Sequence, residues 1–273
     1  MKYFVKELNK GFETKKELFK ALKKNQKLLM DKKKSTIKEK VNAGVIGFLD
    51  KKDNTVKALP NMEDDFIYPI ISNTNYLDSH DDVHLNGSMN KTAKDQSGKI
   101  YYLADHKPEI DNVIALPKDV EIYIQTVKWS DIGRNYEGET EVMVFKIHKD
   151  NIEHEKFLKF LNKGHKFPNS IRMIYVKYDV AYNSKDPEYA EEYKVWNEVS
   201  PLIVNKERLE QQPFFYAVRE LRIVLEGSAV LDASNDATTT DSKTKTKKKK
   251  PSEDTSKKPP KSTSPFYKQI INQ

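Results

Sequence analysis

The sequence contains no cysteine among its 273 residues. This absence excludes disulfide bridges, thiolate zinc sites, iron–sulfur clusters and cysteine nucleophiles. Long apolar runs are also missing: no run approaches the roughly 18 residues that a membrane-spanning helix needs, and the mean hydropathy is −0.78. The first residues lack the apolar stretch of a signal peptide. We therefore expect a protein of a reducing compartment that does not enter a membrane.

Local catalytic motifs are missing as well. The sequence has no HExxH, no GxxxxGK[ST], no GxGxxG and no GxSxG, so it lacks the usual signatures of zinc peptidases, P-loop enzymes, dinucleotide-binding enzymes and α/β-hydrolases. No nucleophile is therefore identified by a short motif.

The net charge of +7 is distributed unevenly. Residues 1–40 hold 14 lysines against 5 acidic residues, and residues 241–273 hold 10 lysines against 3. The stretch between them has 24 basic and 33 acidic residues. The basic character belongs to the ends, and it does not favour nucleic acid as a specific partner of the body. If the protein bound nucleic acid through these ends, its affinity would fall steeply with salt concentration, and this dependence would disappear when the ends are removed.

Residues 1–40 form a basic N-terminal segment with one predicted helix over residues 11–30. Thr14 and Glu17 have the spacing of a capping box, and Leu18, Leu22 and Leu29 form an apolar stripe. We expect this amphipathic helix to dock on the domain or on a partner. A nucleic-acid arm is the less favoured alternative, because interleaved arginines and aromatics are missing.

The body of the chain combines β-rich runs with helices. A second helix is expected after Asp150, which has capping-box spacing to Glu153, and should end at Gly164; a third should begin at Pro187 and a fourth after Pro201. The pattern predicts an α+β fold. The expected strands are Val45–Leu49, Phe66–Ile71, Lys99–Leu103, Val120–Val127, Val142–Ile147 (central in its sheet), Ser170–Val180 and Phe214–Leu231, the last being one long strand or two strands broken near Gly227.

Residues 238–273 form a Lys-rich tail. Its composition is dominated by Thr, Ser, Asp, Lys and Pro, which cannot bury enough apolar surface to offset the entropy of ordering. We predict that the tail is disordered. The patch Phe266–Ile271 is either a short docking motif or an end without function.

Acidic residues and histidines are concentrated between Asp78 and His84. His80 and His84 are four residues apart, which on a helix would suit a metal ion. The surrounding run 73–87 is rich in Asn, Asp, Ser and Gly, which favours a solvated acidic loop. We expect neither a metal ion nor another cofactor.

Separated segments of the chain carry a family resemblance. Residues 78–83 have the sequence Asp-Ser-His-Asp-Asp-Val, and Leu103–Pro108 has Leu-Ala-Asp-His-Lys-Pro. They resemble the Asp-x-His-Gly-Asp-hydrophobic loop and the Asp-His segment of the tailed-phage prohead (procapsid maturation) serine proteases, whose fold is related to the herpesvirus assemblins. The resemblance places that family's catalytic histidine at His106.

Two further segments follow in the order of that family. Leu161–Gly164 and then Asn169–Ile171 resemble a helix end followed by Ser-Ile-Gly-aromatic, which places the nucleophile at Ser170. Leu225–Val230 and then Ala233–Asn235 resemble the C-terminal strand signature, Glu-hydrophobic-Ser-hydrophobic-Val followed by Pro-Ala-Asn. This match places Glu226 at the third catalytic position.

The sequence departs from the family pattern near two of these positions. Arg172 and Met173 replace a glycine and an aromatic residue after the serine, Gly227 replaces a hydrophobic residue, and Asp232 replaces a proline. The three catalytic residue types remain. We expect a pocket beside Ser170 whose shape differs from that of the family.

The resemblance implies a role for each catalytic position. His106 is the general base that activates the Ser170 hydroxyl, and Glu226 orients the imidazole. Asp105 is a rival for the third role, but adjacent residues on a strand point to opposite faces. The candidates for an oxyanion site are the backbone amides of Ile171 and Arg172 and the guanidinium groups of Arg172, Arg219 and Arg222.

The resemblance also implies a fold and a function. Residues 41–237 would be a β-rich, barrel-like, assemblin-related protease domain. The enzyme would cleave the scaffold protein, arms of the major capsid protein and itself, inside the phage procapsid in the host cytoplasm, without a membrane or a cofactor. The basic ends could hold it to acidic scaffold, and a homo-oligomer is left open. The alternative is a non-catalytic, scaffold-like assembly protein, in which Ser170 and His106 need not lie within hydrogen-bond distance.

Overall fold

The fold is described from a computed structural model, which covers residues 3–35, 37–41, 63–78, 80–165 and 167–231. The predicted strand Val45–Leu49, the matched segment Ala233–Asn235 and the tail 238–273 lie outside the described residues. The α-helices are α1 (Lys15–Lys24), α2 (Gln26–Ser35), α3 (Asn90–Gln96), α4 (Glu155–Asn162), α5 (Ala190–Val199) and α6 (Lys206–Gln211). The strands are β1 (Tyr3–Val5), β2 (Lys10–Phe12), β3 (Lys38–Val41), β4 (Phe66–Ile67), β5 (Ile70–Asn73), β6 (Asp82–His84), β7 (Tyr101–Ala104), β8 (Val113–Ala115), β9 (Glu121–Lys128), β10 (Glu139–His148), β11 (Asn169–Tyr182) and β12 (Phe214–Ala229).

The described strands form three sheets in an α+β fold. Strands β1 and β2 make a hairpin, and β10 is the centre of a four-stranded sheet with β4, β5 and β9, which confirms the central position predicted for Val142–Ile147. The six-stranded sheet has the order β3-β11-β12-β7-β8, and β6 also pairs with β12. None of these sheets of described strands closes into a barrel.

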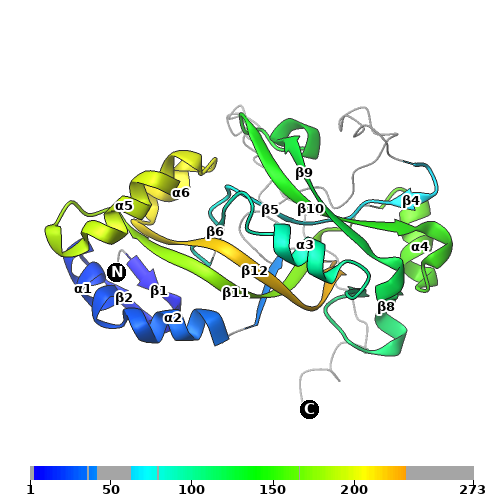
Figure 1. Ribbon diagram of the computed structural model, residues 1–273, viewed down its shortest axis with the longest axis horizontal. Helices are drawn as coiled ribbons and strands as arrows, with labels where there is room; N and C mark the ends of the chain where they lie inside the picture. The colour runs from blue at the N-terminus through cyan, green and yellow to red at the C-terminus, as the bar shows by residue number, and fades with distance from the viewer. Residues whose placement is uncertain (1–2, 36, 42–62, 79, 166, 232–273) are drawn as a thin grey trace, which may run out of the picture. The chain divides into compact units, whose positions relative to one another are not determined.

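The six-stranded sheet is built around one long antiparallel ribbon. Strands β11 and β12 lie side by side over most of their length (Figure 1), from the pair Asn169–Ala229 to the pair Tyr182–Phe214. Along the other edge of β12, β6 pairs at Tyr216–Val218 and β7 pairs at Glu226–Ala229, both in parallel. At the end of the ribbon that holds Glu226–Ala229, residues of β7, β11 and β12 from distant parts of the sequence therefore lie side by side.

The N-terminal segment docks on the same core as the ribbon. Leu18, Leu22 and Leu29 are buried in the main hydrophobic cluster, which confirms docking on the domain. The capping box is also confirmed, because Thr14 Oγ1 accepts from the Glu17 amide. The single predicted helix is instead two, α1 and α2. They meet at Asn25, whose side-chain amide donates to the Ala21 carbonyl at 2.7 Å.

The second predicted helix begins later than expected. Helix α4 begins at Glu155, and His154 Nδ1 caps it by accepting from the Phe157 amide at 3.0 Å. Asp150 lies instead in a 3₁₀ turn, so the predicted capping box is wrong: the imidazole satisfies the helix N-terminus in its place. Gly164 ends the helix at φ +82°, as predicted. Among the described helices, none has the length and apolar character to span a membrane.

Candidate active site

Ser170 lies at the second residue of β11, buried between two neighbouring strands. Its Cα is paired with Ser228 of β12 on one side and with Val41 of β3 on the other. The prediction that this serine stands at the start of a strand after a helix and a turn is confirmed. Because both edges are paired here, the backbone that carries the hydroxyl is fixed on both sides.

His106 and Ser170 are in direct contact. The Nε2 atom of His106 lies 2.5 Å from Ser170 Oγ, although the residues are 64 positions apart in the sequence. The other ring nitrogen, Nδ1, lies 2.7 Å from the Glu226 carboxylate. An ionised carboxylate only accepts hydrogen bonds, so Nδ1 carries the proton and Nε2 is left to accept from the serine hydroxyl.

The position of His106 is set by two backbone hydrogen bonds. After β7, Asp105 and His106 both adopt the left-handed region, at φ +54° and +55°, which is uncommon for residues other than glycine. The Asp105 amide donates to the Ala229 carbonyl at 2.8 Å, and the His106 amide donates to Ser228 Oγ at 3.2 Å. The two residues therefore follow the strand rather than belong to it. Strand alternation was the wrong reason to set Asp105 aside; the contact made by Glu226 is the better one.

Glu226 is fully buried, yet both of its carboxylate oxygens accept hydrogen bonds. Oε1 accepts from His106, and Oε2 accepts from the Ser228 hydroxyl at 2.6 Å. Arg172 Nε lies 3.9 Å from Oε1. Burying a carboxylate without such partners would cost free energy. The two hydrogen bonds offset that cost and hold Glu226 in place as an acceptor for the imidazole.

Ser228 is a site residue to which the sequence reasoning gave no role. It accepts from the His106 amide and donates to Glu226, so it links the backbone of His106 to the Glu226 carboxylate. The signal was present, because residues two apart on a strand share a face, and Ser228 follows Glu226 by two.

A bulge in β12 aims Glu226 at the site. Ile171 pairs with Gly227 and Met173 pairs with Ile223, so one residue of β11 is opposed by three residues of β12. Leu225, in the middle of the three, has φ +72°, which is an outlier for a bulky side chain. The departure at Gly227 has a packing reason: an added Cβ would lie 3.0 Å from the Phe145 ring.

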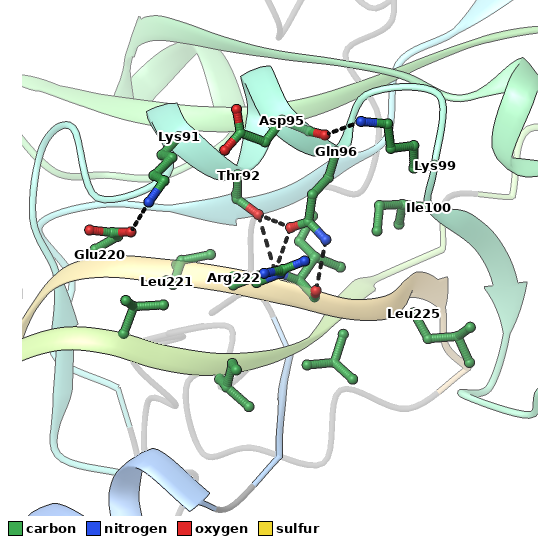
Figure 2. A pocket seen from close by; sticks show the side chains of 14 residues that line it. Lys91, Thr92, Asp95, Gln96, Lys99, Ile100, Glu220, Leu221, Arg222 and Leu225 are labelled. Carbon is green, nitrogen blue, oxygen red and sulfur yellow. Dashed lines mark hydrogen bonds and ion pairs between the residues drawn. The ribbon is translucent and has the colours of Figure 1, made fainter.

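Two cavities lie beside Leu225 and share it as a wall. The larger, about 650 Å³, is lined by residues of α3, by β12 from Glu220 to Leu225 and by Ile174 and Val176 of β11 (Figure 2). Helix α3 is fastened there, since the Gln96 side chain donates to the Ile223 carbonyl at 3.0 Å and Thr92 Oγ1 accepts from the Ile223 amide at 3.1 Å. The smaller cavity is about 260 Å³. Its lining includes residues that precede His106 in the sequence (Tyr101, Leu103) and residues that follow it (Pro108, Ile110, Val113).

The three arginines named as oxyanion candidates lie in different places. Arg172 is beside Glu226, as above, and Arg222 lines the larger cavity (Figure 2). Arg219 instead forms ion pairs with Asp179 and Glu198. Asp179 pairs with Ala217 on the ribbon, well away from Ser170, so Arg219 is the wrong candidate.

The acidic cluster of residues 78–84 is buried rather than solvated. Asp78, Asp81, Asp82 and His84 are each at most 5% exposed, which corrects the prediction of a solvated loop. The reason is Lys33, whose ammonium lies 2.7 Å from the Asp82 carboxylate and so offsets its charge. Among the described residues, no group of three or more His, Asp or Glu side chains is arranged to hold a metal ion.

No family model matches this chain, and no curated protein or solved structure is significantly similar to it.

Proposed function

We propose that this chain is a serine endopeptidase of the prohead-maturation type, with an assemblin-related protease domain. One observation carries the proposal: two short hydrogen bonds join Ser170, His106 and Glu226 in the order that a serine nucleophile, its base and an orienting acid require. The ordered resemblance around the same three residues supports it independently of the geometry.

The chemistry follows from the hydrogen bonds. Ser170 Oγ attacks the carbonyl carbon of a peptide bond while His106 Nε2 takes its proton and then gives it to the leaving amine. Glu226 holds Nδ1 and stabilises the imidazolium that forms. Water then hydrolyses the acyl-enzyme with His106 acting as base again. Of the oxyanion candidates, the Arg172 side chain lies beside Glu226, whereas the amides of Ile171 and Arg172 belong to residues that are paired in the sheet.

The proposed substrates are those of the resemblance. They are the scaffold protein, the arms of the major capsid protein and the enzyme itself, inside the procapsid in the host cytoplasm. An extended peptide would bind by adding a strand to a sheet edge.

A small fluorophosphonate tests the proposal without a known substrate. It should react with Ser170 and produce a single adduct that peptide mass spectrometry locates. Ser170→Ala should abolish the adduct, and His106→Ala should slow labelling by at least about 10³-fold, because an unassisted hydroxyl is a poor nucleophile. Ser130→Ala, at an exposed serine, is the matched control and should label normally. A folded wild-type protein that stays unlabelled would favour the non-catalytic assembly protein.

A second experiment tests peptidase activity itself. Purified wild-type protein, incubated alone and analysed by intact-mass spectrometry, should yield fragments that Ser170→Ala does not. Equal fragmentation of both proteins would identify a contaminating protease and contradict the assignment.

A further inference from the structure

The face of β11 that carries Ser170 continues away from the candidate active site. On this strand Met173 and Tyr175 are buried in the main hydrophobic cluster. Because side chains alternate between the two faces of a strand, Ile174 and Val176 lie on the other face, which is the face of Ser170. That face is the more open of the two, since Val176 is 38% exposed.

The same face includes Arg222 of β12. Arg222 pairs with Ile174 across the ribbon, and paired residues of antiparallel strands share a face. Its neighbours Leu221 and Ile223 are buried in the main hydrophobic cluster, whereas Arg222 is exposed. Four residues of extended strand separate Ile174 from Ser170, a span of about 13 Å. Arg222 therefore lies on the face of the nucleophile but some distance along the ribbon from it.

The larger cavity, of about 650 Å³, lies on this face, and we call it the α3 groove. Its lining from the ribbon is mainly apolar and includes Ile174, Val176 and Val224 (Figure 2). It also includes Leu225, the residue before Glu226. The groove therefore extends from Arg222 to the residue next to the proposed orienting acid.

The α3 groove has an excess of positive charge. Its lining contributes the cations Lys91, Lys99 and Arg222 against the carboxylates of Asp95 and Glu220. Glu220 is already paired, because the Lys91 ammonium lies 3.1 Å from its carboxylate. The described part of the chain supplies no hydrogen bond or ion pair to the Arg222 guanidinium group. An acidic side chain that enters the groove would therefore find an unpaired cation above an apolar lining.

We propose that the α3 groove binds an extended segment of the substrate and that Arg222 selects an acidic side chain in that segment. The inference rests on the proposed serine peptidase and adds its substrate preference. A guanidinium group can donate two parallel hydrogen bonds to one carboxylate. An extended peptide covers the span from Ser170 to Ile174 with about as many residues as β11 does, which puts the acidic residue about three to five residues from the cleaved bond. Aliphatic residues beside the acid fit the rest of the lining.

The first test identifies the peptides that the full-length protein cleaves. A chymotryptic peptide library from a bacterial proteome is incubated with the protein, and mass spectrometry locates the cleaved bonds. The wild type should cleave peptides with Asp or Glu at one fixed position, about three to five residues from the bond. Arg222→Glu should lose this preference and favour Lys or Arg at that position. Lys94→Glu makes the same change of charge at an exposed residue of α3 that does not line the groove, and should cleave the wild-type set.

A pair of peptides then measures the contact itself. One cleaved peptide is compared with a copy in which Asn or Gln replaces the selected acidic residue. For the wild type, kcat/KM should fall by about tenfold on this replacement, because a charge-assisted hydrogen bond is lost. For Arg222→Gln the two peptides should differ by less than about threefold, because the partner of the acid is already missing.

Fluorophosphonate labelling separates this role from a role at the oxyanion. A donor to the oxyanion acts on the small reagent as well as on peptides, whereas a residue of the groove contacts only the peptide. Arg222→Gln should therefore slow the cleavage of acidic peptides more than the labelling of Ser170. If both slow equally, Arg222 acts at the reacting atoms and the inference is wrong.

Failure of this inference can be separated from failure of the proposed function. If Ser170 reacts but no library peptide is cleaved, if the cleaved peptides share no acidic position, or if Arg222→Glu leaves that position unchanged, the α3 groove does not select the substrate. If Arg222→Glu instead changes the mass of the protein in solution, the groove binds a second copy of the chain. If Ser170 does not react in the folded protein, the peptidase proposal itself fails.

Discussion

Two buried carboxylates on the same sheet have very different partners. Glu226 of β12 and Asp82 of β6 are both fully buried, and each accepts hydrogen bonds at both oxygens. Asp82 is bound by the Lys33 ammonium and the Tyr175 hydroxyl, whereas Glu226 is bound by the His106 imidazole and the Ser228 hydroxyl. The carboxylates are alike; the groups that face them decide what each cluster can do.

The Asp82 cluster holds its charge fixed. Burial alone would lower the pKa of the Lys33 ammonium, but Asp82 and Glu7 together raise it above its usual value. The cation also lies 4.1 Å from the centre of the Tyr216 ring. A proton held this firmly is not exchanged at neutral pH, so the cluster serves to fasten α2 to the domain.

The Glu226 cluster ends instead in groups that exchange protons. The imidazole of His106 can accept or donate a proton at its ring nitrogens, and the His106 side chain is 12% exposed, whereas that of Lys33 is 2% exposed. Solvent and a substrate can therefore approach one cluster and not the other. The comparison teaches that burial of an acid does not by itself mark a candidate site; an accessible partner that can take up and release a proton does.

The largest effect should come from neutralising Glu226. Glu226→Gln keeps the shape of the side chain but can no longer stabilise an imidazolium as a carboxylate does. We expect labelling of Ser170 and self-cleavage to slow by about 10²–10⁴-fold, with some turnover left because the nucleophile and base remain. Labelling kinetics measure the loss. Asp105→Asn is the matched control, and if it instead caused the loss, Asp105 would take the third role.

The next largest effect should be on stability rather than on chemistry. Lys33→Ala leaves Asp82 buried without its cation, and breaking such a pair costs about 3–5 kcal/mol. Lys91→Ala breaks the exposed pair with Glu220 and should cost less than about 1 kcal/mol. Denaturant titrations of the Ser170→Ala background measure both without self-cleavage. Equal losses would show that the Asp82 cluster does not hold the domain together.

The sequence predicted local features more reliably than the contacts between distant segments. The capping box at Thr14 depends on four residues, and the central strand around Val144 depends on its own apolar run; both are confirmed. The acidic residues before His84 were predicted to be solvated because the run 73–87 around them is polar, but their neutralising partner, Lys33, is 49 positions from Asp82. Nothing local predicts that contact.

The candidate site shows the same limit. His106, Ser170 and Glu226 were named by resemblance, and their spacing alone could not place them together. The pairing of β3 with β11 beside Ser170 is also non-local, since Val41 and Ser170 are far apart in the chain. The sequence contains these residues, but only the sheet order brings them to one place.

A smaller effect should come from Asp81, the residue before Asp82 in the Asp82 cluster. Burial raises the pKa of Asp81 from 3.8 to about 7, against the lowering influence of Arg208 and Lys33. The folded state therefore binds a proton that the unfolded state has released, and stability falls as pH rises from about 4 to about 7. Asp81→Asn removes this penalty and should stabilise the protein by up to about 4 kcal/mol at pH 8 and little at pH 4. Thermal unfolding at the two pH values checks it, and a gain independent of pH would contradict the assigned cause.

The smallest effect should come from Leu225, the residue before Glu226. At φ +72° a leucine is strained, and strain of this kind costs on the order of 1–3 kcal/mol. Glycine adopts this conformation without strain, whereas alanine keeps most of it. Leu225→Gly should therefore be more stable than Leu225→Ala by about 1 kcal/mol, which reverses the order expected inside a strand. Val224, the preceding residue on β12, is the control position, and there Val224→Ala should be the more stable of the two variants. If glycine were the less stable replacement at Leu225 as well, the bulge would carry no strain, and the aim of Glu226 toward His106 would need another cause.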